Sequence, residues 1–201
     1  RGMTTTSDGV QHPVLLLGGG IGAGKSRVAA VFAERGFEVI EADTVGHDVL
    51  EHDAGAIAAV RAAWPDAVQG GVVDRTTLAR IVFADPDALA KLESITHPAI
   101  GDTLHQRIEA ATAPVVVEVP VMKVLAQEPY VRVAVVADAH VREDRAVVRG
   151  ASRDDVRRRM RHQPVDTLWV AWADRVIDNS GDWDMTAVAV HALIDEVLGD
   201  G

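Results

Sequence analysis

Continuous apolar runs along the chain alternate with segments in which apolar residues recur every three or four positions. The clearest runs are PVLLLGG from Pro13, PVVVEVPV (114–121) and VRVAVVAD (131–138). Strands that are buried on both faces have this composition, because helices cover both sides of a parallel sheet. FEVIEAD (37–43) and ADRVIDN (173–179) are expected to be two further strands. Strands that alternate with helices predict an α/β fold around a mainly parallel sheet.

The segments between these runs have helical spacing of their apolar residues. Helices are expected at 25–36, 44–64, 140–150, 152–163 and 184–198. A longer helical stretch, 75–112, is expected to be interrupted at Pro86 and Pro98, because proline lacks the N–H that a helix interior needs. The helical part from about 45 to 112 is too long for a simple crossover, so we expect it to form a subdomain.

Length and composition limit the architecture and the function. With 201 residues, the chain is expected to form one domain over residues 12–200, and residues 1–11 are expected to be disordered. A net charge of −10 argues against general nucleic-acid binding, because such proteins are usually basic. The absence of cysteine excludes disulfides and thiolate chemistry, and no apolar run approaches the roughly 18 residues of a membrane span. We expect a cytoplasmic protein without a secretory signal, with Met3 as its native start.

The segment GGGIGAGKSR (18–27) follows the first expected strand and opens the first expected helix. Gly19, four residues, Gly24, Lys25 and Ser26 satisfy the pattern G-x-x-x-x-G-K-[ST]. Glycines let backbone N–H groups converge on phosphate oxygens, and the following helix adds the positive end of its dipole. Lys25 is expected to reach the β- and γ-phosphates of a nucleotide, and the Ser26 hydroxyl to ligate Mg²⁺. A structural glycine turn is the alternative, but the strand–loop–helix context favours nucleotide binding.

Several polar residues follow the expected strands directly, where ligands bind in doubly wound sheets. Asp43 follows the second strand and is a candidate general base, although an aspartate there can equally cap the next helix. Glu41 and Asp43, two apart, would point to the same side of a strand. Glu118, in the third strand, is a candidate acid for magnesium, but a polar residue at a strand end has many uses. Asn179 ends the last strand.

Arginines are concentrated between residues 142 and 161 of this acidic chain. The arginines are Arg142, Arg145, Arg149, Arg153, Arg157, Arg158, Arg159 and Arg161. They are either a solvated basic face, partly balanced by neighbouring acids, or a lid that brings guanidinium groups onto a phosphate. The lid is favoured because the rest of the chain is acidic. His97, before Pro98, has no neighbouring ligand cluster that would indicate zinc.

Five segments, in order over nearly the whole chain, match the pattern of one family. They are GGIGAGKS, VIEAD, GVVDRTTLARIVFADPDALAKLESITHPAI, RRRMRHQ and ADRVIDN. Taken together they resemble the dephospho-coenzyme A (dephospho-CoA) kinases. The loop alone is generic, whereas its combination with His97-Pro98 and the C-terminal VIDN is specific to that family.

The resemblance implies a P-loop kinase fold of the α/β class. Its doubly wound, mainly parallel sheet would have helices on both faces, an acceptor-binding helical insertion at about 45–112 and an arginine-rich lid at about 139–163. The implied activity is the ATP- and Mg²⁺-dependent phosphorylation of the ribose 3′-hydroxyl of dephospho-CoA, the last step of coenzyme A synthesis. We expect a monomer whose partner is this small molecule, with no nucleic acid or membrane involved.

The resemblance also assigns roles to residues. Asp43 matches the catalytic aspartate, and His97 falls in the coenzyme-binding region. Arg145 and Arg149 would belong to the lid, and Asn179 would lie near the adenine. The residues that match the ATP phosphate site are Gly20, Gly22, Ala23, Gly24, Lys25, Ser26 and Arg27.

The departures from the family pattern lie mainly on the acceptor and lid sides. Glu41 replaces an aspartate, His47 an arginine, and PVMKV (120–124) a segment with an aromatic residue and an acid; Arg27 stands where threonine or serine is usual. The lid is also shortened. Two alternatives therefore stay open, namely a related kinase for another small-molecule hydroxyl, such as a nucleoside or nucleotide, and a nucleotide-binding paralogue without phosphotransfer.

Overall fold

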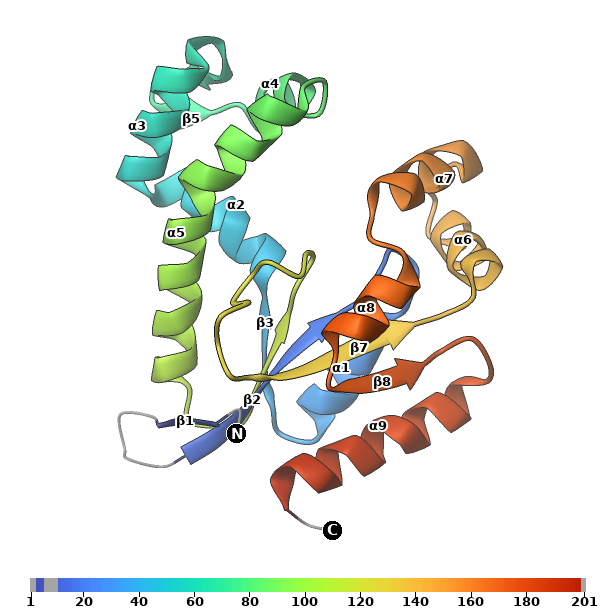
Figure 1. Cartoon of the computed structure of the whole chain (residues 1–201). Coiled ribbons are helices and arrows are strands. Elements are labelled where there is room, and N and C mark those ends of the chain that lie inside the picture. Colours follow the sequence, from blue (N-terminus) through green and yellow to red (C-terminus); the bar gives the residue numbers. More distant parts are fainter. Residues whose placement is uncertain (1–2, 6–10, 200–201) are drawn as a thin grey trace. The chain divides into compact units, whose positions relative to one another are not determined.

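A computed structural model describes residues 3–5 and 11–199 of the chain, with side chains from residue 11 onward. The described residues divide between two compact units, one formed by those up to residue 41 together with those from residue 108 onward, the other by residues 42–107. In the first unit, five strands form a parallel sheet in the order β3–β6–β2–β7–β8 (Figure 1). These strands are β2 (Gln11–Gly18), β3 (Glu38–Glu41), β6 (Val115–Glu118), β7 (Val131–Val136) and β8 (Arg175–Asp178). The expected α/β fold with a mainly parallel sheet is therefore confirmed.

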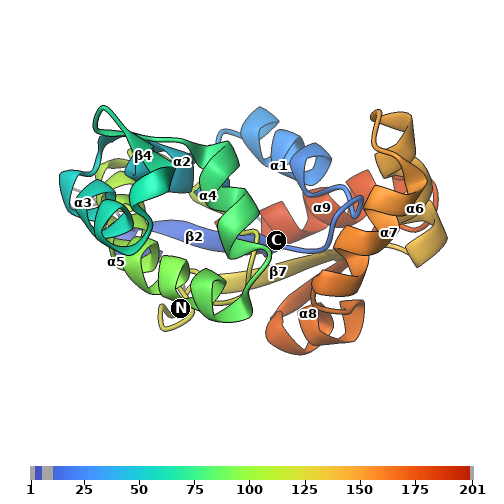
Figure 2. The same cartoon turned by 90° about the horizontal axis from the view of Figure 1, so that it is seen from above.

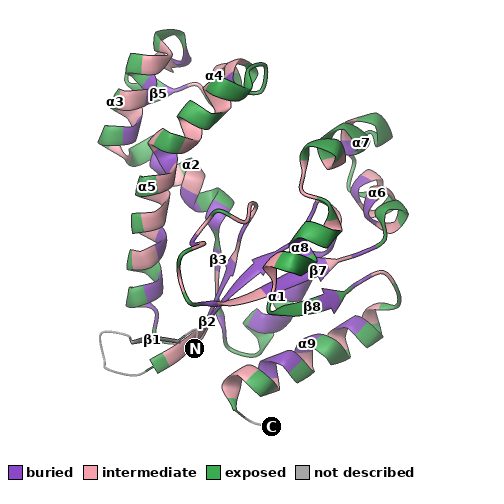
Figure 3. Cartoon of the chain, viewed as in Figure 1, coloured by how far each residue is buried: buried purple, intermediate pink, exposed green. Residues whose placement is uncertain are grey.

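Both faces of the central strand are covered, which explains its continuous apolar sequence. Successive side chains of a strand point to opposite faces, and Leu15 and Leu17 belong to the core beneath α1 (Lys25–Glu34) and α9 (Trp183–Leu198). On the other face, α8 (Asp166–Trp172) brings Trp169 against Gly18. Figure 2 shows α1 and α9 on one side of β2 and β7 and α8 on the other. Figure 3 shows that the inner strands β6, β2 and β7 are largely buried, whereas the edge strand β8 is mostly exposed.

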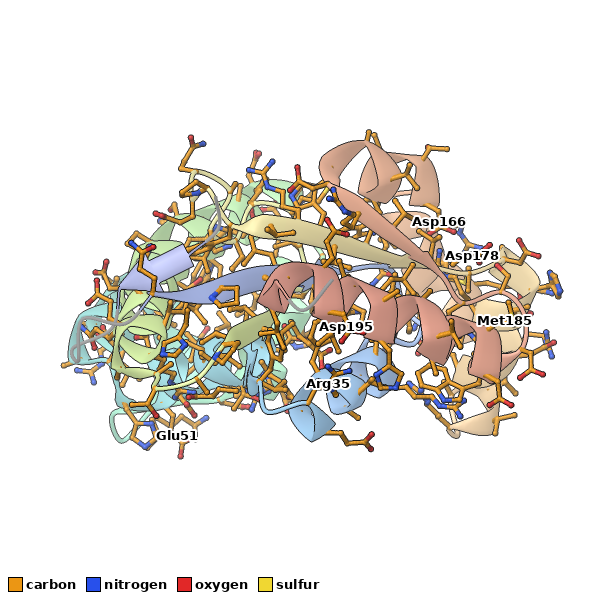
Figure 4. All side chains as sticks on the ribbon, turned by 90° about the horizontal axis from the view of Figure 1, so that it is seen from below. Arg35, Glu51, Asp166, Asp178, Met185 and Asp195 are labelled. Carbon is orange, nitrogen blue, oxygen red and sulfur yellow. The ribbon has the colours of Figure 1, made fainter. Side chains whose placement is uncertain are left out.

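The two helices on the first face are joined at their surface by an ion pair. Arg35, which caps the C-terminus of α1, donates from its Nη2 to Asp195 Oδ1 of α9 at 2.6 Å (Figure 4). Beneath this pair, Phe32 and Phe37 pack edge to face with ring centroids 5.1 Å apart. Such a half-exposed ion pair contributes at most about 1 kcal/mol, so the apolar contacts hold the helices in place.

The second unit is mostly helical. Its elements are α2 (Ala42–His52), α3 (Ala54–Ala63), a 3₁₀ turn (Pro65–Ala67), a hairpin of β4 (Val68–Gln69) and β5 (Val72–Val73), α4 (Arg75–Val82) and most of α5 (Pro86–Ala110). Val60, Leu78 and Val82 are among its buried core residues. The carboxylates of Asp53 and Asp74 accept hydrogen bonds from the first N–H groups of α3 and α4, which fixes where these helices begin.

Three local expectations are corrected by the structure. The second strand ends at Glu41 rather than Asp43, because α2 already begins at Ala42. Asp43 is thus in the first turn of a helix and does not share a strand face with Glu41. α5 continues through Pro98 instead of stopping there. Ser94, whose carbonyl loses its helical partner, is exposed, so water can satisfy that carbonyl.

The N-terminal segment contributes a short strand that pairs with β2. Of the segment 1–11, which we expected to be disordered, residues 1–2 and 6–10 lie outside the described residues. Met3–Thr5 form strand β1, which pairs antiparallel with β2, and Gln11 already belongs to β2. Among the described residues, no helix is both long and apolar enough to cross a membrane.

Replacing Pro98 by alanine restores one helical hydrogen bond and removes a steric conflict inside α5. We expect Pro98→Ala to raise the free energy of unfolding by about 2 kcal/mol, measured by urea unfolding followed by circular dichroism. Pro86→Ala is the matched control, because proline at the first helical position costs little, and we expect a change within about 0.5 kcal/mol. A Pro98→Ala protein no more stable than the unsubstituted chain would contradict this account.

Candidate phosphate-binding loop and arginine lid

The loop between β2 and α1 has three glycines with a backbone conformation that favours glycine. Gly19, Gly22 and Gly24 have φ values of 146°, 75° and 102°, which residues with a Cβ rarely adopt. Gly24 is also the N-cap of α1, and no side chain accepts a hydrogen bond there. No side chain therefore competes with an anion for the N-terminus of α1, the kind of helix end that binds phosphate in other proteins.

Close contacts around the loop also require glycine. A Cβ on Gly19 would lie 2.3 Å from the carbonyl oxygen of Val135, and a Cβ on Gly24 would lie 2.2 Å from Asn179 Nδ2. The Asn179 side chain is buried and donates from Nδ2 to the carbonyl of Ala23 at 2.8 Å. Its Oδ1 accepts from Thr186 Oγ1 at 3.2 Å. Asn179 thus contacts the loop backbone, and Thr186, which no sequence motif indicated, orients it.

The side chains that follow the last glycine lie along one side of the loop. Lys25 Nζ donates to the Gly19 carbonyl at 2.8 Å, which keeps the ammonium group on the loop. The exposed Ser26 hydroxyl donates to Glu118 Oε2, at the end of β6, at 3.4 Å. Ser26 and Glu118 therefore place two oxygen atoms of the kind that Mg²⁺ prefers next to each other. Arg27 turns away and stacks on the Trp183 ring, 3.8 Å from its centroid.

The arginine-rich segment forms α6 (Ala139–Val148) and α7 (Arg153–His162), and most of its charges are already paired. Arg153 contacts Glu143 and Asp144, and Arg157 Nε donates to Glu143 at 3.0 Å. Arg158 and Arg159 both pair with Asp155. The hydrogen bonds from Arg157 and Arg153 hold the pKa of Glu143 below its usual value, so this carboxylate stays charged at neutral pH. Arg153 and Arg157 thus link α7 to α6, whereas the pairs of Arg158 and Arg159 lie within α7.

Three other arginines of the segment have different surroundings. Arg142 is 4% exposed and reaches the loop and Asp166. Arg145, one turn later, has its Nη1 atom buried without a hydrogen-bond partner among the described residues. A buried guanidinium N–H without a partner costs about 1–3 kcal/mol, which an anionic ligand would recover. Arg149 is exposed and caps the C-terminus of α6.

The expected acceptor residues belong to the second unit. Asp43 is exposed in the first turn of α2, and His97 is half-buried in the middle of α5. His47, one turn after Asp43, contacts Arg75 Nη2 through its Nε2 at 2.6 Å. Both residues border a groove of about 690 Å³ between α2, α4 and α5, whose apolar lining includes Leu78 and Phe83. No group of three or more possible metal-binding side chains occurs in the part of the chain that the structure describes.

The sheet order, the glycine loop and the helix that it opens define the class of a P-loop kinase. A model of the dephospho-CoA kinase family matches residues 14–184, most of the chain. The chain belongs to the dephospho-CoA kinase family. The match includes the loop, the arginine-rich helices α6 and α7 and the whole second unit.

Relatives and solved structures agree with this assignment. A dephospho-CoA kinase of Frankia casuarinae is 40% identical over 190 residues, which are 92% of this chain and 81% of that protein. One of Thermus thermophilus is 31% identical over 94% of both chains. A crystal structure of a Thermus thermophilus protein has a TM-score of 0.79 and 31% identity, covering 92% of this chain and 98% of its own. Acinetobacter baumannii shikimate kinase, 14% identical with a TM-score of 0.53 and coverage of 94% of both chains, shares the fold.

A methyl group at Gly24 would strain the backbone, whose φ is 102°, and would also clash with the Asn179 side chain. We expect Gly24→Ala to weaken binding of a fluorescent ATP analogue at least 100-fold. Gly36→Ala is the matched control, because Gly36 also has a positive φ of 86° but nothing lies within 4 Å of an added Cβ. This control should cost about 1–2 kcal/mol of stability and leave the analogue's Kd within about twofold. Equal losses of affinity in both variants would show that backbone strain at a positive φ, and not the clash of the added methyl group, weakens binding of the analogue.

Proposed function

We propose that the protein catalyses the phosphorylation of the ribose 3′-hydroxyl of dephospho-CoA by ATP, which yields coenzyme A and ADP. Family membership over residues 14–184 carries this proposal, because the relatives bear the name of this activity. In the reaction, the 3′-oxygen forms a bond to the γ-phosphorus. The bond from that phosphorus to the β–γ bridging oxygen breaks, and ADP leaves.

The ATP phosphates are proposed to lie on the loop at the start of α1. The residues assigned to them are Gly20, Gly22, Ala23, Gly24, Lys25, Ser26 and Arg27. Uncapped N–H groups of α1 and the Lys25 ammonium, which lies on the loop, support this role. Arg145 and Arg149 are proposed to stabilise the charge on the transferring group, as cationic groups do in phosphoryl transfer. Asn179 supports the loop through Ala23, and the adenine is proposed to lie near it.

Magnesium is proposed to bind at Ser26, with Glu118 as a second oxygen ligand or as the partner of a bound water. When bound, Mg²⁺ neutralises negative charge on the β- and γ-phosphates. The 3.4 Å contact between the two side chains supports the pairing. A magnesium ion that takes its other ligands from phosphates and water needs only one or two protein oxygens.

The acceptor is proposed to bind through the second unit, with Asp43 accepting the proton of the 3′-hydroxyl and orienting it. Its exposed place in the first turn of α2 leaves the carboxylate accessible to a ligand. His97 is proposed to contact the coenzyme. We further propose that the protein acts as a cytoplasmic monomer on this small molecule and binds neither nucleic acid nor membranes.

A second candidate function is the phosphorylation of another small-molecule hydroxyl. The observation behind it is His47, which stands where the family pattern has arginine and is engaged with Arg75 at the apolar groove. PVMKV (120–124) likewise differs from the family. A nucleotide-binding protein without phosphotransfer is the third candidate, and the same assay separates all three.

The assay measures ADP release from Mg-ATP with and without dephospho-CoA, and the mass of the product. We expect release to depend on dephospho-CoA and the product to be heavier by one phosphoryl group. Nucleosides and nucleotides are tested in parallel as acceptors. Transfer to one of these compounds but not to dephospho-CoA would support the second candidate. Binding of ATP without transfer to any acceptor would support the third candidate, a nucleotide-binding protein without phosphotransfer.

Removing the charge of Asp43 should separate catalysis from nucleotide binding. We expect Asp43→Asn to lower kcat by about 100- to 10,000-fold, the usual contribution of a general base, with the Kd of a fluorescent ATP analogue unchanged within about twofold. Asp87→Asn is the matched control, because Asp87 is also exposed in the first turn of a helix of the second unit. Near-normal turnover of Asp43→Asn would remove Asp43 from this role.

A further inference from the structure

Two side chains from the segment between β7 and β8 contact the phosphate loop at Ile21. The backbone N–H of Ile21 donates to Gln163 Oε1 at 2.7 Å. The carbonyl of the same residue accepts from Arg142 Nε at 2.9 Å. Arg142 comes from α6, and Gln163 is the C-cap of α7. Both lid helices are therefore tied to the same residue of the loop.

Arg142 makes a second contact that fixes its orientation. Its Nη1 donates to Asp166 Oδ1 at the start of α8, in an ion pair whose arginine side chain is 5% exposed and whose aspartate side chain is 31% exposed. Removing a charge from water costs several kcal/mol, which a single ion pair seldom returns as net stability. The pair is thus better explained by the position that it gives to Arg142 than by stability.

The glycines of the loop are fitted to this arginine. A Cβ on Gly20 would lie 2.2 Å from Arg142 Nη2, and one on Gly22 would lie 2.2 Å from the Arg142 carbonyl oxygen. Gly20, unlike Gly22, does not have a positive φ. Its lack of a side chain is therefore explained by the guanidinium group that lies against it. At Gly22 the backbone of α6 itself packs on the loop.

We propose that Arg142 is a positioning residue that holds α6 against the phosphate loop and so presents Arg145 to the γ-phosphate. Residues three apart on a helix share a face, so anchoring Arg142 also fixes the direction of Arg145. The Nη1 atom of Arg145, buried without a partner among the described residues, is the donor that this arrangement presents. The inference rests on the proposed ATP-dependent phosphotransfer, in which Arg145 contacts the transferring group.

A double-mutant cycle on nucleotide affinity tests the coupling without using the acceptor. We expect Arg142→Met and Arg145→Met each to raise the Kd of a fluorescent Mg-ATP analogue about tenfold, and the double variant to raise it no further than either alone. Arg35→Met is the control, because its ion pair with Asp195 joins α1 to α9 at the surface, and its Kd should stay within about twofold. Multiplied effects in the double variant would overturn the proposal, as would an unchanged Kd in Arg142→Met.

Loss of folding is separated from loss of positioning by removing both charges of the buried pair. Arg142→Met/Asp166→Leu replaces the pair by apolar side chains, which often preserves stability. We expect a thermal midpoint close to that of the unsubstituted protein, with the Kd still raised about tenfold and the kcat lowered about 100-fold. A normal Kd in this variant would show that the pair acts through stability alone and would overturn the proposal.

The two proposals fail in different ways. Absence of dephospho-CoA-dependent turnover in the unsubstituted protein, together with a non-additive cycle, would reject the proposed reaction and keep the role of Arg142. Normal turnover with an additive cycle would keep the reaction and reject that role.

Discussion

The close approach of other groups to the backbone between Gly19 and Gly24 is the constraint on which the rest of the first unit depends. The carbonyl of Val135, the amide of Asn179 and the guanidinium of Arg142 come from three different parts of the chain, and each occupies the space of a missing Cβ. The loop is therefore shaped by its surroundings as much as by its own flexibility. This packing requires glycine in addition to the positive φ values, and in the proposed role a phosphate would meet a backbone that is already held in place.

The first unit was largely predictable, because burial on both faces of the sheet requires continuous runs of apolar residues in the sequence. Leu15 and Leu17 pack toward α1 and α9, while Val14 and Leu16 are equally buried on the other face, so the run has no polar interruption. The loop pattern was equally clear, because its glycines, Lys25 and Ser26 are recognised by residue type and spacing. Both features occur in short stretches of sequence, so a single chain suffices to find them, although the groups that pack on the loop could not be found in this way.

The features that were missed or wrong depend on surroundings that residue type and spacing do not reveal. The sequence around Pro98 does not indicate that α5 continues. The other hydrogen bonds of the helix, and solvent at the exposed Ser94, compensate for the hydrogen bond that Pro98 cannot donate. The contact of Asn179 with Ala23 joins residues 156 positions apart. Likewise, composition could not divide the arginines of 142–161 into those paired with Glu143 or Asp155 and those directed elsewhere. Partner identity, not residue type, decides which arginines remain for a ligand.

This division of the arginines also explains how an acidic chain can offer cations to a phosphate. Charges on exposed ion pairs are screened by water and contribute little to stability or to binding. Burial changes that balance, because a partly desolvated guanidinium without a partner interacts strongly with an anion that enters. Arg145 has one such atom, while Arg142 has its charge balanced by Asp166 and is left with a purely geometric task. In the proposed mechanism, α6 therefore holds its place through Arg142 and supplies positive charge through Arg145 on the next turn.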